Sequence, residues 1–391
     1  MATVAREAQM VVVGWQVYEA TRDPLSLGLI GLAEALPFIA VALYAGHIAD
    51  KASRKWVAIL GIFGLLLSAI ALLIFTLRPE TLAHGRVWPI YIVIFLSGIA
   101  RSFTRPALTA LSADVVPRET FQSAVAWRTS TWHFAAILGP ALGGLLYGFR
   151  GALAAYATVT ALMTISLAVL LFISAEERPA EKEEMTIGES LRIGLRFVFS
   201  QRVILAAMSL DLFSVLFGGA VALLPIFARL LDVGPQGLGV LRAAPAVGAV
   251  LMGIAIAHRP PMQRAGRSMF IAVAIFGLAT IGFGLSRSFI LSVILLTIGG
   301  MADNVSVVIR STLIQTLTPA NMLGRVSAVN QIFIGSSNEI GAFESGVAAK
   351  LLGTVPSVLF GGVMTLIVVA VTSWAAPQLR KLRRIDDLTP V

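Results

Sequence analysis

The sequence contains no cysteine and only four histidines among its 391 residues. Without cysteine, the chain can form no disulfide, no thiolate nucleophile and no cysteine metal site. The histidines are scattered without the spacing of metal ligands: they are His47, His84, His133 and His258. Charged residues are scarce as well, at 13% of the chain, whereas soluble proteins have about a quarter. We therefore expect no metal, no cofactor and no water-covered globular surface.

Hydrophobic residues, in contrast, make up 57% of the chain. The formal net charge of +9 would suit a nucleic-acid partner, but no basic stretch is interleaved with the aromatic residues on which bases stack. Lysine and arginine collect in the cytoplasmic loops of membrane proteins, and this explains the charge without nucleic acid. The composition indicates a protein that resides in a lipid bilayer.

Apolar segments of spanning length, about 20 helical residues for a bilayer core of about 30 Å, recur along the chain. Each must be helical, because lipid offers no partners to open backbone groups. We predict eleven full spans, at residues 25–45, 56–77, 87–107, 121–147, 152–174, 203–230, 236–257, 268–286, 288–310, 324–349 and 355–376. The predicted fold class is an all-α membrane protein.

The apolar segment nearest the N-terminus, Met10–Tyr18, is too short to span. It follows the charged residues Arg6 and Glu7, and no small-residue cleavage site follows it as in a signal peptide. We interpret it as the second half of a first helix that begins upstream, which gives twelve spans in the intact protein.

Basic residues gather in alternate connections between the spans. One set of connections, together with the tail, carries Lys51, Arg54, Lys55, Arg118, Arg178, Lys182, Arg192, Arg196, Arg259, Arg264, Arg267, Arg325, Arg380, Lys381, Arg383 and Arg384. The opposite set holds few cations, so the positive-inside rule places the first set and the C-terminus in the cytoplasm. We expect a multi-pass protein of the bacterial inner membrane.

The longest polar stretch, SAEERPAEKEEM at residues 174–185, lies between two predicted spans. Thr186 and Glu189 after it have the spacing of a helix capping box. The apolar residues that follow share one helical face: Ile187, Leu191, Leu195 and Val198. We predict an amphipathic helix on the cytoplasmic membrane surface; a solvated linker is the alternative. This linker, 175–202, divides an N-terminal bundle, 1–174, from a C-terminal bundle, 203–376, with a tail at 377–391.

A motif in one cytoplasmic connection carries a family resemblance. Gly46–Lys55 reads GHIADKASRK, and the equivalent connection of the second half repeats fragments of it, as expected for parallel repeats. The motif matches the G-x-x-x-D-[RK]-x-[GS]-R-[RK] signature of the major facilitator superfamily, which the chain resembles throughout. The resemblance implies a fold of two six-helix bundles, alternating access and a monomer. We interpret Asp50, Arg54 and Lys55 as a gating latch; an ordinary basic loop is the alternative.

A second motif, at the end of a predicted span, reads GPALGG over Gly139–Gly144. It is similar to the G-P-x-x-G-G core associated with antiporters of that superfamily, although Ala135 stands where a further glycine is expected. Small residues let helices approach closely, and Pro140 removes a backbone donor. Gly139, Pro140, Gly143 and Gly144 therefore suit either a rocking joint or simple close packing.

Short stretches also resemble the bacterial exporter family that includes the enterobactin exporter: Val13–Tyr18, Ser209–Phe213 and Phe343–Gly346. This resemblance favours export over uptake.

Charged residues inside spans are costly, about 2.5–3.5 kcal/mol each at a helix centre on insertion scales, and are functional candidates by default. Acids in partly dry sites can exchange protons near neutral pH. The candidate proton carriers are Asp211, Glu34, Asp303, Glu339 and Glu344, of which we favour the first two. The alternative is that these acids are held in structural pairs with arginines.

Other polar and aromatic residues are expected to line a substrate cavity. The candidates are Gln16, Arg101, Arg105, Arg128, Phe213, Phe217, Asn330, Gln331 and Asn338. Arg101 and Arg105 lie one turn apart and would meet an anionic substrate, or instead mark the membrane boundary. An apolar cavity with few polar anchors suits a bulky amphipathic ligand.

The sequence thus predicts a proton-coupled exporter of a small organic molecule, siderophore-like or drug-like. An uptake symporter of the same fold is the alternative. A membrane-embedded enzyme is disfavoured, because the chain has no H-E-x-x-H, G-x-S-x-G or P-loop pattern.

Overall fold

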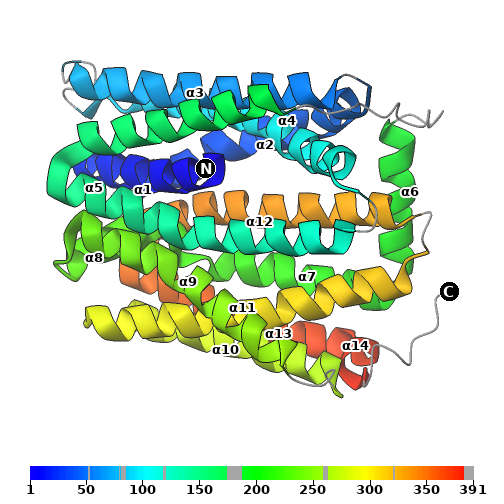
Figure 1. Cartoon of the computed structure of the whole chain (residues 1–391). Helices are drawn as coiled ribbons and strands as arrows, with labels where there is room; N and C mark the ends of the chain where they lie inside the picture. Colours follow the sequence, from blue (N-terminus) through cyan, green and yellow to red (C-terminus); the bar gives the residue numbers. More distant parts are fainter. Residues whose placement is uncertain are drawn as a thin grey trace. The chain divides into compact units, whose positions relative to one another are not determined.

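The computed structural model describes residues 1–51, 53–78, 80, 85–117, 120–173, 187–258, 263–319 and 322–382, with the backbone alone described at 42–51, 113–114, 121–122, 125 and 187. In this part of the chain every regular element is a helix (Figure 1). The helices are α1 (Ala2–Thr21), α2 (Pro24–Lys51), α3 (Arg54–Leu77), α4 (Trp88–Val115), α5 (Phe121–Phe172), α6 (Ile187–Ser200), α7 (Arg202–Gly218), the 3-10 helix η3 (Ala220–Leu223), α8 (Leu224–Leu230), α9 (Gly234–Ala257), α10 (Ala265–Leu285), α11 (Phe289–Leu317), α12 (Leu323–Leu352), α13 (Thr354–Ala375) and α14 (Pro377–Lys381).

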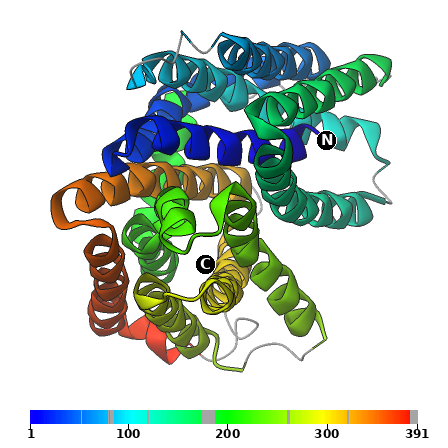
Figure 2. The same cartoon turned by 90° about the vertical axis from the view of Figure 1, so that its left-hand side faces the viewer.

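The helices form two compact units, each with its own core. The N-terminal unit combines Met1–Glu184 with Leu224–Ala243, and the C-terminal unit combines Met185–Leu223 with Ala244–Val391. Within each unit neighbouring helices pack along one another, as α1 does with α5 and α10 with α11, and Figure 2 shows them from the side of the molecule. The division differs from the predicted one, because α8 and the first turns of α9 group with the N-terminal helices. The all-α membrane fold class is confirmed.

Eight helical segments in the described residues are long and apolar enough to cross a membrane. One of them, Ala126–Phe172, contains two predicted spans, because α5 turns back on itself at Gly151. This glycine has φ 79° and ψ 176°, a conformation open essentially to glycine alone. A single residue therefore joins two antiparallel helices, and α1 lies between them (Figure 1).

The first helix is longer than its apolar stretch suggested. α1 has 20 residues, which gives a length of about 30 Å at 1.5 Å per residue. The helix thus extends beyond the apolar stretch, but it is not among the segments of the described residues that are apolar enough to cross a membrane, so the number of spans stays a prediction. Its sequence signal was misleading because Arg6 and Glu7 lie inside the helix, where both are engaged in ion pairs. Ala5 and Ala8 beside them are fully buried.

The predicted amphipathic helix exists as α6, but its apolar face contacts protein. Val198 is fully buried, and Leu191 and Leu195 pack against the same core of the C-terminal unit, which α7 and α12 help to build. Gly194 allows close contact, since a Cβ there would lie 3.0 Å from the carbonyl oxygen of Arg325. The expectation that this face enters lipid is corrected. Thr186 lies outside the described residues.

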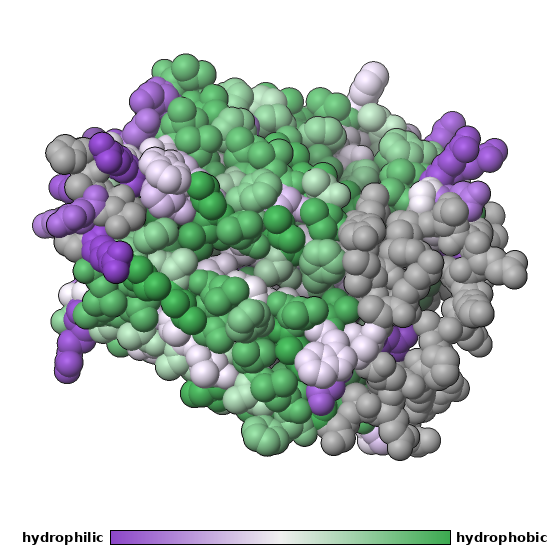
Figure 3. Space-filling model, turned by 90° about the horizontal axis from the view of Figure 1, so that it is seen from above, coloured by the Kyte–Doolittle hydropathy of each residue, from purple (hydrophilic) through white to green (hydrophobic). Residues whose placement is uncertain are grey.

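Apolar side chains are exposed over much of the surface. On α3, Leu60 is 66% exposed and Leu67 is 50% exposed. One face of the molecule shows such residues across its middle, with hydrophilic residues toward its two ends (Figure 3). This distribution fits a surface in contact with lipid, because a band of this kind would drive aggregation in water.

Candidate functional site

The N-terminal unit holds a buried ionic cluster centred on Glu34 of α2. This carboxylate is 5% exposed, and its Oε1 accepts hydrogen bonds from two guanidinium groups. Arg6 Nη2 of α1 lies at 2.6 Å and Arg101 Nη1 of α4 at 2.5 Å. Arg6 Nη1 also donates to Glu7 Oε1 at 2.9 Å. Two cations thus meet two carboxylates, and the cluster ties three helices together.

Close helix packing brings these groups together. At Gly98 of α4, an added Cβ would lie 3.0 Å from the carbonyl oxygen of Glu34 and 2.7 Å from Cγ of Pro37, so only glycine lets α4 approach α2 so closely. Arg101 stands one turn further along α4, and its guanidinium lies 5.4 Å from the ring centroid of Phe38. The local sequence therefore sets the position of the arginine.

The C-terminal unit contains a separate buried pair, Asp211 of α7 and Arg310 of α11. Their side chains form an ion pair, and the two residues are 5% and 3% exposed. The guanidinium Nε of Arg310 and the hydroxyl of Ser306, one turn away, are buried with no hydrogen-bond partner in the described structure. Buried polar atoms of this kind are normally satisfied by protein or by ordered water. The region around the pair is therefore suited to hold water.

Asp303 shares a face of α11 with Ser306 and Arg310, since residues three and seven apart lie together on a helix. It stands in the middle of this spanning helix and is partly buried. It has no hydrogen bond or ion pair in the part of the chain that the structure describes. Of the two favoured acids, Asp211 and Glu34, both are held by arginines, whereas Asp303 is not.

The other predicted carriers lie on α12. Glu339 is 9% exposed and Glu344 is half-buried. Among the polar residues of α12, the carbonyl oxygen of the Asn330 side chain is buried and has no hydrogen-bond partner among the described residues. Gln331 and Asn338 are exposed, and Asn338 donates to the backbone oxygen of Ile334 on its own helix at 2.8 Å.

The remaining cavity candidates do not gather around one common site. Phe213 is 45% exposed, while Phe217 packs edge-to-face on Phe360 of α13 with ring centroids 6.5 Å apart, which assigns it a packing contact. Arg105 and Arg128 are exposed.

Gln16, a cavity candidate on α1, is hydrogen-bonded to a buried tyrosine of α5. The fully buried Tyr156 of α5 donates its hydroxyl to Gln16 Oε1 at 2.8 Å. Three residues along α1, Glu19 accepts a hydrogen bond from Tyr147 at 3.0 Å. Polar contacts thus fix α1 to both halves of α5.

The predicted gating motif is helical over much of its length. α2 continues through Gly46 and Asp50 to Lys51, but the side chains there lie outside the described residues. Arg54 begins α3, and Lys55 Nζ donates to the carbonyl oxygen of Leu171 at 3.1 Å. This ammonium group lies at the C-terminal end of α5, where it interacts favourably with the partial negative charge of the helix.

The glycines of the GPALGG motif contact two different helices. A Cβ at Gly143 would lie 2.6 Å from the carbonyl oxygen of Ala8, and Gly139 faces the same stretch of α1. Gly144 points elsewhere, with Pro235 and Gly239 of α9 within 3 Å of an added Cβ. The motif packs α5 on α1 and α9 at once; its role as a gating joint remains a proposal.

A prediction follows from this packing. Gly143→Ala should lower the thermal unfolding midpoint of the purified protein, because overpacking a tight contact costs about 1–3 kcal/mol. Intrinsic fluorescence of the six tryptophans provides the measurement. Gly324→Ala is the matched control, since nothing lies within 4 Å of a Cβ there. Equal behaviour of the two variants would contradict the close contact.

Three engaged residues escaped the sequence analysis. Arg310 was placed at the end of a span predicted to stop there, but α11 continues to Leu317. Arg6 was noted only as a charged residue ahead of the apolar stretch Met10–Tyr18, and Tyr156 was given no role. Helical spacing offered one usable signal, since Asp303 and Arg310 are seven residues apart.

Comparison with known proteins agrees with this architecture. The sequence profile of the Major Facilitator Superfamily matches residues 1–342. The enterobactin exporter EntS of Escherichia coli O1:K1 is 27% identical over 382 residues, covering 96% of this chain and 89% of that protein. The same identity and coverage hold for the enterobactin exporter EntS of Shigella boydii serotype 18.

Among solved structures, a D-xylose-proton symporter superposes with a TM-score of 0.71 at 14% identity, over 98% of this chain and 97% of that one. At this identity the likeness concerns the fold alone. Together with the family match, it confirms the resemblance noted in the sequence and excludes the enzyme alternative. This chain is a multi-pass membrane transporter that belongs to the Major Facilitator Superfamily.

Proposed function

We propose that the protein is a proton-coupled exporter of a small organic molecule, working by alternating access as a monomer in the inner membrane with its C-terminus in the cytoplasm. Export and a siderophore-like or similarly bulky substrate are supported by the similarity to enterobactin exporters over 96% of the chain. The few polar anchors inside the spans fit an amphipathic ligand.

Proton coupling is carried by one observation, the position of Asp303. An ionised carboxylate inside a membrane span needs a partner, and Asp303 forms no hydrogen bond or ion pair in the described residues. Binding a proton would remove its charge, so the stability of a conformation that buries Asp303 would depend on protonation. The carboxylates of Asp211 and Glu34 are held by arginines, so we assign them a smaller part in proton transfer. Glu339 and Glu344 are likewise ranked behind Asp303 as proton carriers.

The driving force is adequate for such a mechanism. One charge moved through 100 mV releases about 2.3 kcal/mol. A proton arriving from the periplasm would neutralise Asp303 and shift the balance between outward-open and inward-open states. Its release into the cytoplasm would accompany movement of the substrate in the opposite direction.

Everted membrane vesicles with an acidified lumen and a pH-sensitive dye test the proposal. Siderophores and amphipathic drugs are added one at a time to the wild-type protein, to Asp303→Asn and to Asp232→Asn. The last is a matched control on the exposed α8–α9 connection. We expect substrate-dependent proton release with the wild type and the control, and its loss in Asp303→Asn at unchanged protein level.

The alternatives give different results. If no compound releases protons through the wild-type protein, proton-coupled export is wrong. If the wild type releases protons and Asp303→Asn does so equally, the export mechanism stands but another acid carries the proton. Substrate that leaves the acidified lumen together with protons would indicate the uptake symporter.

A further inference from the structure

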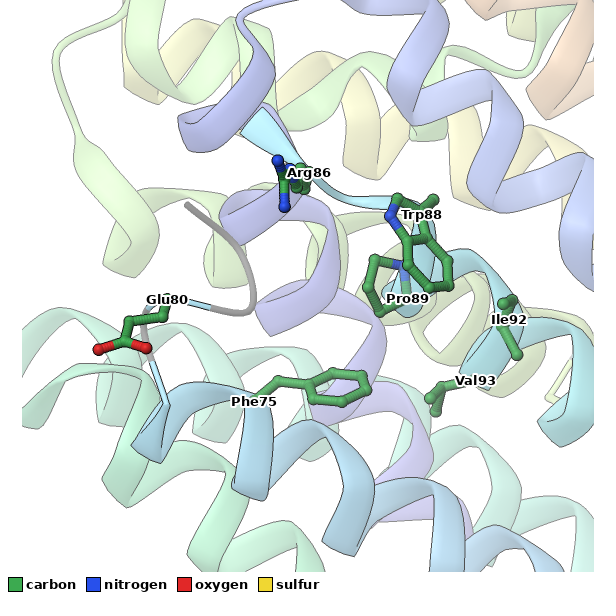
Figure 4. Close-up of a pocket in the computed structure, with 7 residues that line it drawn as sticks. All are labelled: Phe75, Glu80, Arg86, Trp88, Pro89, Ile92 and Val93. Carbon is green, nitrogen blue, oxygen red and sulfur yellow. The ribbon is translucent and has the colours of Figure 1, made fainter. Parts of the chain in front are cut away.

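A groove in the N-terminal unit opens where α3 ends and α4 begins (Figure 4). Its volume is about 420 Å³, and its lining residues are Phe75, Glu80, Arg86, Trp88, Pro89, Ile92 and Val93. The end of α3, which is long and apolar enough to cross a membrane, meets the start of α4 here, so we place the groove at the membrane boundary. The orientation predicted from the loop charges would put it on the periplasmic side.

The groove has an apolar floor and two charged residues at its rim. Phe75 reaches in from α3, and Ile92 and Val93 come from the first turns of α4 (Figure 4). Trp88 is 61% exposed and Ile92 is 48% exposed, as expected for residues that touch lipid. Tryptophan and arginine at a span end are typical of the interfacial belt.

The two charges lie on different parts of the rim. Glu80 and Arg86 carry opposite charges and line the same groove, yet they form no ion pair with each other. In the described part of the chain, neither has a hydrogen bond or ion pair with any other residue. The close-up shows Glu80 and Arg86 at separate places around the apolar side chains (Figure 4).

We propose that this groove binds a zwitterionic phospholipid with a primary ammonium group, such as phosphatidylethanolamine. The Arg86 guanidinium would bind the phosphate and the Glu80 carboxylate the ammonium, so that the headgroup bridges the two charges. Phe75, Ile92 and Val93 would contact the upper part of an acyl chain. Charge-assisted hydrogen bonds of this kind are stronger than neutral ones. A lipid can reach the groove directly from the bilayer, so its acyl chain needs no separate path into the protein.

The choice of headgroup follows from hydrogen bonding and charge. A primary ammonium donates hydrogen bonds to a carboxylate, which the quaternary ammonium of phosphatidylcholine cannot do. Phosphatidylglycerol has the phosphate without any cation, so its headgroup would leave Glu80 unpaired beside a negative charge. The groove should therefore prefer the ethanolamine lipid over both of these.

Native mass spectrometry of the purified full chain provides the test. The protein is delipidated in detergent and offered an equimolar mixture of dioctanoyl phosphatidylethanolamine, phosphatidylcholine and phosphatidylglycerol. For the first bound lipid we expect about a tenfold preference for ethanolamine over glycerol, the ratio expected when one charge-assisted hydrogen bond is lost.

Three variants identify the site. Glu80→Gln should bring the preference for ethanolamine over glycerol close to unity, and Arg86→Gln should weaken retention of all three lipids. Arg287→Gln, an exposed arginine on the α10–α11 connection, should change neither quantity. Equal retention of the three lipids by the wild type would overturn the proposal, and so would a preference that persists in Glu80→Gln.

Discussion

Replacing Asp211 by Asn should destabilise the protein severely, because the Arg310 guanidinium would keep its charge at a position only 3% exposed. Removing one partner of a buried ion pair costs about 3–5 kcal/mol. The expected result is a large drop in the thermal unfolding midpoint, measured by tryptophan fluorescence, together with a low yield of folded protein. Arg310→Gln should have a similar effect, since it leaves the Asp211 carboxylate buried alone.

The double variant Asp211→Asn/Arg310→Gln is the informative control. It removes both charges and leaves two neutral polar groups, so it should be markedly more stable than either single variant. Neighbouring residues that interact show non-additive effects of this kind in double-mutant cycles. Additive losses from the two substitutions would mean that the ion pair does not stabilise the C-terminal unit.

Glu34→Gln should be the second strongly destabilising change. Both Arg6 and Arg101 donate to the same carboxylate oxygen, so its loss would leave two like charges close together in a buried site. The cost should approach the range of about 3–5 kcal/mol for a broken buried pair, reduced by the partial exposure of the Arg6 and Arg101 side chains, 26% and 17%. The thermal unfolding midpoint again gives the measurement, with retention in detergent as a second readout.

Two companions separate the charge effect from a general intolerance of this site. Glu7→Gln should be mild, because Arg6 would still bind Glu34. The double variant Glu34→Gln/Arg101→Gln should recover part of the lost stability, since Arg6 retains Glu7 and the repulsion is gone. If Glu7→Gln proves as damaging as Glu34→Gln, the central role of Glu34 is wrong.

The sequence predicted the broad organisation of the chain because hydrophobic length decides where lipid-spanning helices form. Contacts between helices were not predicted in the same way. Glu34 and Arg101 were both identified as charges inside spans, but they were assigned separate roles, in proton transfer and in substrate binding. Their pairing depends on the approach of α4 to α2 at Gly98, which a single sequence does not display.

The errors have physical causes as well. Charges that are neutralised by partners, as in α1, make a helix look shorter than it is. An apolar face such as that of α6 is compatible with lipid or with protein, since either removes it from water. Residues on the same helix face, such as Asp303 and Arg310, could have been grouped from their spacing, had the span not been ended at Arg310.

The one-residue turn at Gly151 bears on how the chain enters the membrane during synthesis. With no loop between them, the two halves of α5 have no intermediate in which the first is fully inserted while the second still waits outside. We expect them to partition as a hairpin with the exposed Arg150 at its tip, and in the predicted orientation this arginine crosses the bilayer. The apolar length of both helices offsets the cost of moving that charge, about 2.5–3.5 kcal/mol at mid-membrane. We therefore expect residues 121–172 to insert into the membrane together, as one unit.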